Sequence, residues 1–92
     1  MLRGVAHLVD ARHDPTIMDR QMISFLATLA LPTLVVLTKI DKLKKIQRSH
    51  VITTAIDNLG LDEEQLLLFS SKTGEGRNEL LDALESLVEP KN

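Results

Sequence analysis

The 92-residue sequence has no cysteine, no tryptophan and no tyrosine, and Phe25 and Phe69 are its only aromatic residues. Without cysteine the chain can form neither a disulfide nor a thiolate metal site. So few aromatic rings argue against the base-stacking platforms that bind single-stranded nucleic acids. No apolar run approaches the roughly 20 residues that cross a bilayer, so we expect no membrane segment. The formal net charge of −2 does not point to a nucleic acid or an acidic membrane.

A phosphate-binding loop is also missing from the sequence. The pattern G-x-x-x-x-G-K-[ST] surrounds phosphates with backbone N–H groups, while its lysine and hydroxyl serve the γ-phosphate and Mg²⁺. No such run occurs, because Gly74-Glu75-Gly76 is followed by Arg77-Asn78 instead of Lys-Ser. We therefore expect no hydrolysis of a nucleoside triphosphate by this chain.

Three short apolar runs predict strands at residues 5–9, 33–37 and 66–69. Apolar residues at helical spacing predict three helices: one that starts near Thr16 and ends before Pro32, one over residues 42–59, and one marked by residues 80–88. Thr16 and Asp19 resemble a capping box, and Gly60 suits a left-handed helix end. The βαβαβα order predicts an α/β fold with a three-stranded parallel sheet. We interpret residues 1–92 as one partial domain.

The apolar spacing also predicts which helix faces are buried. The first helix should bury a stripe that includes both of its methionines: Met18, Met22, Phe25, Leu26 and Leu29. The second helix has Ile52, Ala55, Ile56 and Leu59 on one face, and the third is marked by Leu80, Leu81, Leu84, Leu87 and Val88. We expect the first two helices to share one face of the sheet and the third to cover the other.

Polar residues follow each predicted strand: Asp10, Lys39, Asp41, Ser71 and Lys72. Because the carboxyl ends of parallel strands meet at one rim, these residues should converge there, where open α/β sheets bind ligands. A carboxylate accepts two hydrogen bonds side by side, and guanine offers a ring N–H and an amino group on one edge.

Asp57-Asn58-Leu59-Gly60 matches the D-x-x-G pattern of GTPases by letters only, and we interpret it as a helix end.

Two of these segments carry a family resemblance. Thr38-Lys39-Ile40-Asp41-Lys42 resembles the fourth GTPase motif, [NT]-K-x-D, and Ser70-Ser71-Lys72 resembles the fifth. The run from Val9 to His13, with Pro15, Thr16 and Asp19, is similar to the EngB family of bacterial ribosome-assembly GTPases. The resemblance covers nearly the whole chain but only the C-terminal half of that family's domain, so the phosphate-loop half is absent.

The resemblance implies a site for GTP or GDP formed by Thr38, Lys39, Asp41, Ser70, Ser71 and Lys72. Asp41 would bind the guanine edge, and Lys39 and Lys72 would cover the two ring faces. The Ser71 N–H would donate to the guanine carbonyl oxygen. In relatives the position of Thr38 more commonly holds an asparagine, which braces the phosphate loop. That loop is absent here, so the role of Thr38 stays open. Mg²⁺ would bind only in the full-length parent, and the chain alone would be inactive as a GTPase.

The family also implies partners and a compartment. The resemblance implies a role in large-subunit assembly and cell division. Met1-Leu2-Arg3 leads almost directly into a predicted strand, so we see no signal peptide and expect a cytoplasmic protein. A basic cluster of Lys42, Lys44, Lys45 and Arg48 predicts either a solvated surface or a contact with ribosomal RNA. The first strand would leave a bare edge, which predicts self-association.

Two other function classes stay open. In a receiver-like domain Asp10 would accept a phosphoryl group, with Lys72 steadying the phosphate and Asp41 near a metal. In an interaction module the bare strand edge would be the binding surface. A plainer interpretation of Asp10 is a strand-end carboxylate that pairs with Arg12. His7 is expected to be a hydrogen-bonded core residue, and the histidines at 13 and 50 lack zinc-ligand spacing.

Overall fold

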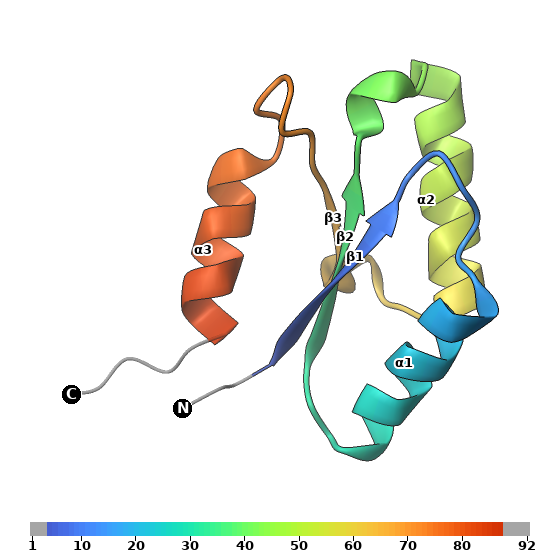
Figure 1. Cartoon of the computed structure of the whole chain (residues 1–92), viewed down its shortest axis with the longest axis vertical. Helices are drawn as coiled ribbons and strands as arrows, with labels where there is room; N and C mark the ends of the chain where they lie inside the picture. The colour runs from blue at the N-terminus through green and yellow to red at the C-terminus, as the bar shows by residue number, and fades with distance from the viewer. Residues whose placement is uncertain (1–3, 88–92) are drawn as a thin grey trace.

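The computed structural model describes residues 4–87, which form a parallel β-sheet flanked by helices (Figure 1). In chain order the elements are β1 (Val5–Asp10), α1 (Ile17–Thr28), β2 (Thr33–Thr38), α2 (Lys45–Leu59), β3 (Leu66–Leu68) and α3 (Arg77–Leu87). Two short 3₁₀ turns, η1 (Ile40–Lys42) and η2 (Glu63–Gln65), precede α2 and β3. The predicted α/β class and βαβαβα order are confirmed. Val88, the last residue of the predicted third helix, and Met1–Arg3 lie outside the described residues.

The strand β2 is the centre of the sheet. The strand order is β1-β2-β3, and both pairings are parallel, with Val5 opposite Thr33 and Val35 opposite Leu66. The β2 side chains of Val35, Val36 and Leu37 are completely or almost completely buried. This continuous apolar run is typical of a parallel strand that is covered on both faces.

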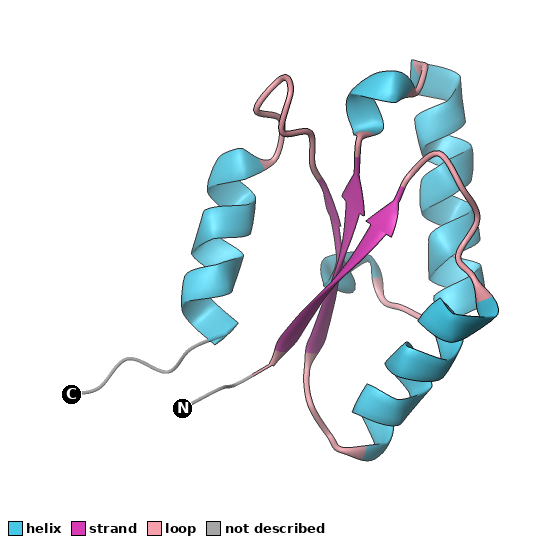
Figure 2. Cartoon of the chain, in the orientation of Figure 1, coloured by secondary structure: helices cyan, strands magenta, loops and turns pink. Residues whose placement is uncertain are grey.

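The helices form two layers around the sheet, as expected. Figure 2 shows α1 and α2 together on one face and α3 alone on the other. The main core lies between the sheet and the first two helices. It contains Val9, Ala11, Ile23, Val35, Leu37, Ile40, Ala55, Leu59 and Leu61. No helix within residues 4–87 is long and apolar enough to cross a membrane.

Local sequence signals set the helix ends. Thr16 and Asp19 form the predicted capping box at the start of α1, and Gly60 ends α2 in a left-handed conformation with φ of 65°. The predicted second helix is divided in two, because the chain is extended at Leu43 between η1 and α2. The Lys44 N–H donates to Gln47 Oε1 at 2.8 Å, and this bond satisfies one of the free donors at the start of α2.

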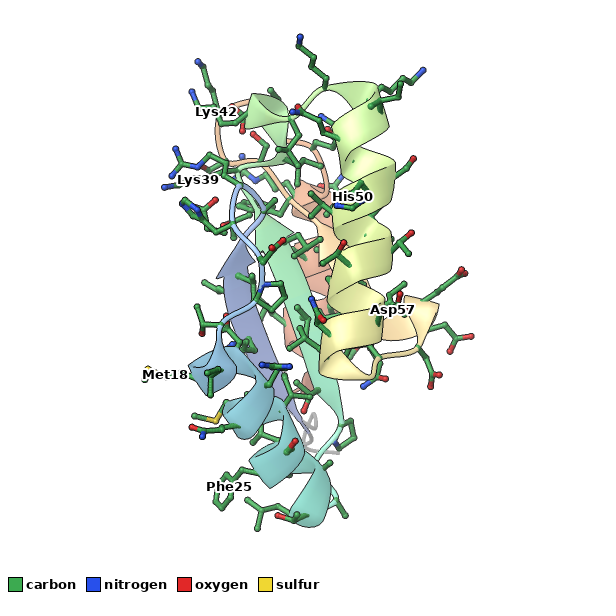
Figure 3. The ribbon with its side chains drawn as sticks, turned by 90° about the vertical axis from the view of Figure 1, so that its right-hand side faces the viewer. Met18, Phe25, Lys39, Lys42, His50 and Asp57 are labelled. Carbon is green, nitrogen blue, oxygen red and sulfur yellow. The ribbon has the colours of Figure 1, made fainter. Side chains whose placement is uncertain are left out.

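The buried face of α1 differs from the prediction. Met18 and Met22 are 77% and 45% exposed, whereas Ile23 and Leu26 are buried. Met18 and Phe25 project away from the sheet in Figure 3. The helix instead turns toward β1, where His7 Nε2 and Asp19 Oδ1 are 2.8 Å apart. The assignment of the methionines to the core was therefore wrong, and the residue missed was Ile23.

Candidate functional site

The turn after β2 presents Lys39 and Asp41 at the rim of the sheet. Thr38 Oγ1 donates to the carbonyl oxygen of Val9 at 3.3 Å, so Thr38 ties β2 to β1. Lys39 adopts the left-handed conformation with φ of 61° and leads from β2 into the 3₁₀ turn η1. Ile40 then enters the core and is 1% exposed. This buried side chain anchors the turn and leaves Lys39 exposed and Asp41 half-buried on either side.

The loop after β3 is closed by its own hydrogen bonds. The Ser70 N–H donates to the Glu75 carbonyl oxygen, and the Gly74 N–H donates to the Ser70 carbonyl oxygen, both at 2.9 Å. The Thr73 N–H donates to Ser70 Oγ at 3.2 Å. Gly76 has φ of 76°, and a Cβ there would lie 1.9 Å from the Leu68 carbonyl oxygen. Only glycine fits this close approach of the loop to β3.

A short side-chain hydrogen bond joins the turn after β2 to the loop after β3. The hydroxyl of Ser70, which is completely buried, donates to Asp41 Oδ1 at 2.6 Å. The Ile40 N–H also donates to the Phe69 carbonyl oxygen at 3.3 Å. The Ser70 hydrogen bond lowers the pKa of Asp41 from its ordinary value, and the positive charge of Lys72 acts in the same direction. Asp41 is therefore held as a carboxylate at neutral pH.

Asp10 is engaged by its neighbours at the same rim. Arg12 donates to it through Nε at 3.1 Å and Nη2 at 2.8 Å, and Lys39 Nζ lies 3.5 Å from Asp10 Oδ2. The side-chain hydrogen bond from Arg12 holds the pKa of Asp10 far below its usual range. The structure thus supports the plainer interpretation of Asp10 as a strand-end carboxylate paired with Arg12.

The loop after β3 leaves donors for a ligand. Ser71 and Lys72 are exposed. Within residues 4–87 their N–H groups take no part in the backbone hydrogen bonds that close this loop. The rim therefore combines a carboxylate, two lysines and exposed backbone donors. Such a set can hold a planar polar ring that offers neighbouring donors to Asp41 and an acceptor to the loop.

Arg48 was missed as a residue of this site. The sequence placed it in a basic cluster on the second helix, but its side chain turns inward and pairs with Glu75 at 2.9 Å. Lys42, Lys44 and Lys45 are exposed, and only Lys45 belongs to α2. Glu75 lies 27 residues further along the chain, so no local pattern could have revealed the pair.

Other candidate residues lie apart from the rim. Figure 3 shows Asp57 near the end of α2 that is remote from Lys39 and Lys42, so the D-x-x-G match is a helix end, as expected. His7 is half-buried and hydrogen-bonded to Asp19, as predicted. Within the described part of the chain, no group of three or more His, Cys, Asp or Glu side chains could hold a metal ion.

Comparison with known proteins decides the family. The family model described as "Elongation factor Tu GTP binding domain" matches residues 1–90. The chain belongs to this family. It is 48% identical over 87 residues to a probable GTP-binding protein EngB of Gemmatimonas aurantiaca, covering 95% of this chain and 43% of that protein. A protein of the same description from Lacticaseibacillus casei is 46% identical over 85 residues, covering 91% of this chain and 43% of its own length.

The structural comparison agrees in fold. The crystal structure of a probable GTP-binding protein engB superimposes with a TM-score of 0.77 at 21% sequence identity, covering 92% of this chain and 56% of that one. The resemblance to EngB proteins, predicted from the run Val9–His13 with the residues that follow it and from the Thr38–Lys42 motif, is confirmed by these relatives. The chain spans less than half the length of the curated relatives that it matches.

Proposed function

We propose that this chain recognises the base of guanine nucleotides, GTP or GDP. The observation that carries the proposal is the hydrogen bond from buried Ser70 to Asp41 at 2.6 Å, because it unites the two motif loops and fixes the carboxylate. Asp41 would accept from the ring N–H and amino group of guanine. The stems of Lys39 and Lys72 would cover the ring faces, and the Ser71 N–H would donate to the carbonyl oxygen.

The proposed base site is selective because adenine lacks the matching donors on that edge. A buried or semi-buried polar group left unpaired costs free energy, so a site built to hydrogen-bond one base rejects the other. Without contacts to phosphate, we expect a dissociation constant of about 1 mM or weaker. GTP hydrolysis and Mg²⁺ binding would require a phosphate-binding loop of the G-x-x-x-x-G-K-[ST] type, which the 92 residues do not contain.

The test is an amide NMR titration with GDP, with ADP as the control ligand. We expect shifts confined to residues 39–42 and 70–74 with GDP only, and their loss in Asp41→Asn. Asp57→Asn is the matched control, because it makes the same change at the remote end of α2 (Figure 3). If neither GDP nor ADP shifts any amide resonance in a well-dispersed spectrum, base recognition by this chain is rejected.

A second proposal concerns ribosomal RNA, in line with a role in large-subunit assembly and cell division in the cytoplasm. Exposed Lys42, Lys44 and Lys45 lie together in the chain, beside a groove lined by residues that include His13, Ile46 and His50. Removing lysine–phosphate contacts flattens the salt dependence of RNA binding. When the logarithm of the RNA binding constant is plotted against the logarithm of salt concentration, Lys44→Gln combined with Lys45→Gln should therefore make the slope less steep. Arg20→Gln on α1 should leave that slope unchanged. Equal slopes would exclude this surface.

We also propose that two copies of the chain associate through the outer edge of β1. The N–H groups of Val5 and Ala11 donate toward β2, to Pro32 and Thr38. Because strand residues alternate in direction, the N–H and C=O groups of Ala6 and Leu8 face away from β2. Leu8 is also 62% exposed. Light scattering at high concentration should show a dimer that Leu8→Lys weakens and Ile46→Lys does not; a monomer at all concentrations would reject the pairing.

A further inference from the structure

Arg48 connects the two loops of the rim from outside both motifs. Its Nη1 donates to Glu75 Oε1 at 3.0 Å and to Glu75 Oε2 at 2.9 Å. Its Nη2 donates to the carbonyl oxygen of Ile40 at 3.2 Å. One guanidinium on α2 therefore contacts both the turn after β2 and the loop after β3.

Each end of this connection leads to a proposed base contact. The Ile40 carbonyl belongs to the peptide unit that continues into Asp41. On the other side, the Glu75 carbonyl oxygen accepts from the Ser70 N–H at 2.9 Å, and Ser70 donates to Asp41. Arg48, Glu75, Ser70 and Asp41 thus form a closed ring of contacts that returns to Arg48 through Ile40.

We propose that Arg48 is a positioning residue for guanine recognition, which holds the two loops at the spacing that Asp41 and the Ser71 N–H need. This inference rests on the proposed function. The planar guanidinium offers donors in a fixed fork, so it can serve a carboxylate and a carbonyl in two directions at once. The Arg48 side chain is 28% exposed and that of Glu75 is 41% exposed, so solvent screens the ion pair and its charge contributes little. The hydrogen bond from Arg48 to the Ile40 carbonyl oxygen is partly buried, so the bridge depends mainly on the forked donors.

Lysine is the informative replacement at position 48. It keeps the charge near Glu75 but presents a single ammonium on a flexible stem in place of two forked donors. We expect the dissociation constant for GDP to rise about fivefold in Arg48→Lys, about 1 kcal/mol of binding free energy. Arg20→Lys on α1 is the matched control and should leave GDP binding unchanged.

A charge swap separates the bridge from a simple ion pair. Arg48→Glu combined with Glu75→Arg can restore the ion pair, but a carboxylate at position 48 has no donor for the Ile40 carbonyl. We therefore expect the swapped chain to bind GDP as weakly as Arg48→Lys or more weakly. Recovery of full GDP affinity in the swap would overturn the bridging role.

The bridge can also be tested without nucleotide, which separates its failure from failure of base recognition. Glu75→Gln should shift the amide resonances of Ile40 and Asp41 on the opposite loop, whereas Glu79→Gln, in the first turn of α3, should not. Shifts restricted to residues near 75 would reject the bridge whatever the nucleotide titration gives. Cross-loop shifts with unchanged GDP affinity in Arg48→Lys would reject the positioning role and leave Arg48 purely structural. Absence of GDP-induced shifts in the unmodified chain would reject base recognition itself.

Discussion

Ser70 and Asp41 lie 29 residues apart in the sequence and are joined by a hydrogen bond of 2.6 Å from the serine hydroxyl to Asp41 Oδ1. The serine is buried and the aspartate faces the rim, so a fixed core position controls a ligand-facing group. The carboxylate enters any binding event already oriented. Preorganisation of this kind removes part of the entropy cost of binding.

The first prediction concerns this pair. Ser70→Ala removes the largest cause of the lowered pKa of Asp41, so we expect that pKa to rise toward its ordinary value. Carboxyl-carbon NMR across the acid range measures it directly. Ser71→Ala is the matched control, because only its backbone N–H is assigned a role, and the Asp41 pKa should then stay as it is. An unchanged pKa in Ser70→Ala would contradict the assigned cause.

The second prediction concerns two glycines of the same loop. In Gly76→Ala the new Cβ would meet the Leu68 carbonyl oxygen at 1.9 Å, whereas in Gly74→Ala nothing lies within 4 Å. Both positions have positive φ, which costs an alanine about 1–2 kcal/mol. We expect about that loss of unfolding free energy for Gly74→Ala and a distinctly larger one for Gly76→Ala. Urea unfolding measures both, and equal losses would show that β3 yields to the clash.

The third prediction separates the two flanks of α1. Ile23→Ala removes a buried side chain and should cost about 2–5 kcal/mol of unfolding free energy. Met18→Ala removes a side chain that is 77% exposed and should change that free energy by less than about 0.5 kcal/mol. Thermal or urea unfolding of both variants provides the measurement. A large loss in Met18→Ala would mean that this flank is covered in solution.

The fourth prediction is a loss of stability in acid. Burial acts to raise the pKa of Asp19, but hydrogen bonds from the Thr16 backbone and from His7 outweigh it, so the pKa is lowered. The pKa of Asp10 is also lowered, chiefly by the Arg12 hydrogen bond. A carboxylate with a lowered pKa in the folded state adds stability above its unfolded pKa, and this is lost as protons bind.

We therefore expect the unfolding free energy to be steady above about pH 5 and to fall as the pH drops below about 4, where unfolded carboxylates titrate. Asp19→Asn should be less stable at pH 7 and should lose less on acidification. Asp57→Asn removes the same charge without touching these bonds, and its acid loss should match that of the unmodified chain. An Asp19→Asn profile parallel to the unmodified one would contradict the assignment.

The sequence predicted the strands, the start of α1 and the end of α2 well because these depend on short-range chemistry. The run from Thr33 to Leu37 has one plausible interpretation, and Gly60 satisfies a local backbone requirement. The convergence of the loops that carry Asp41 and Lys72 also followed, because parallel strands end at one rim.

The face of α1 could not be chosen in this way. Met18 with Met22 and Asp19 with Ile23 form neighbouring stripes at the same helical spacing. The contact of Asp19 with His7 on another element selects between them. Arg48 shows the same limit, because its partner Glu75 is distant in sequence and local charge suggested a solvated cluster. Both errors arise where a tertiary contact overrides a periodic pattern.

The left-handed backbone at Lys39, with φ of 61°, has a consequence for how this position would evolve. Any residue with a Cβ is strained there, and glycine is not. A population of variants selected only for resistance to heat should therefore accumulate glycine at position 39. A population selected for retention on guanine nucleotide should keep lysine. Sequencing this single codon after each selection would report whether the protein was being chosen for its fold or for its ligand.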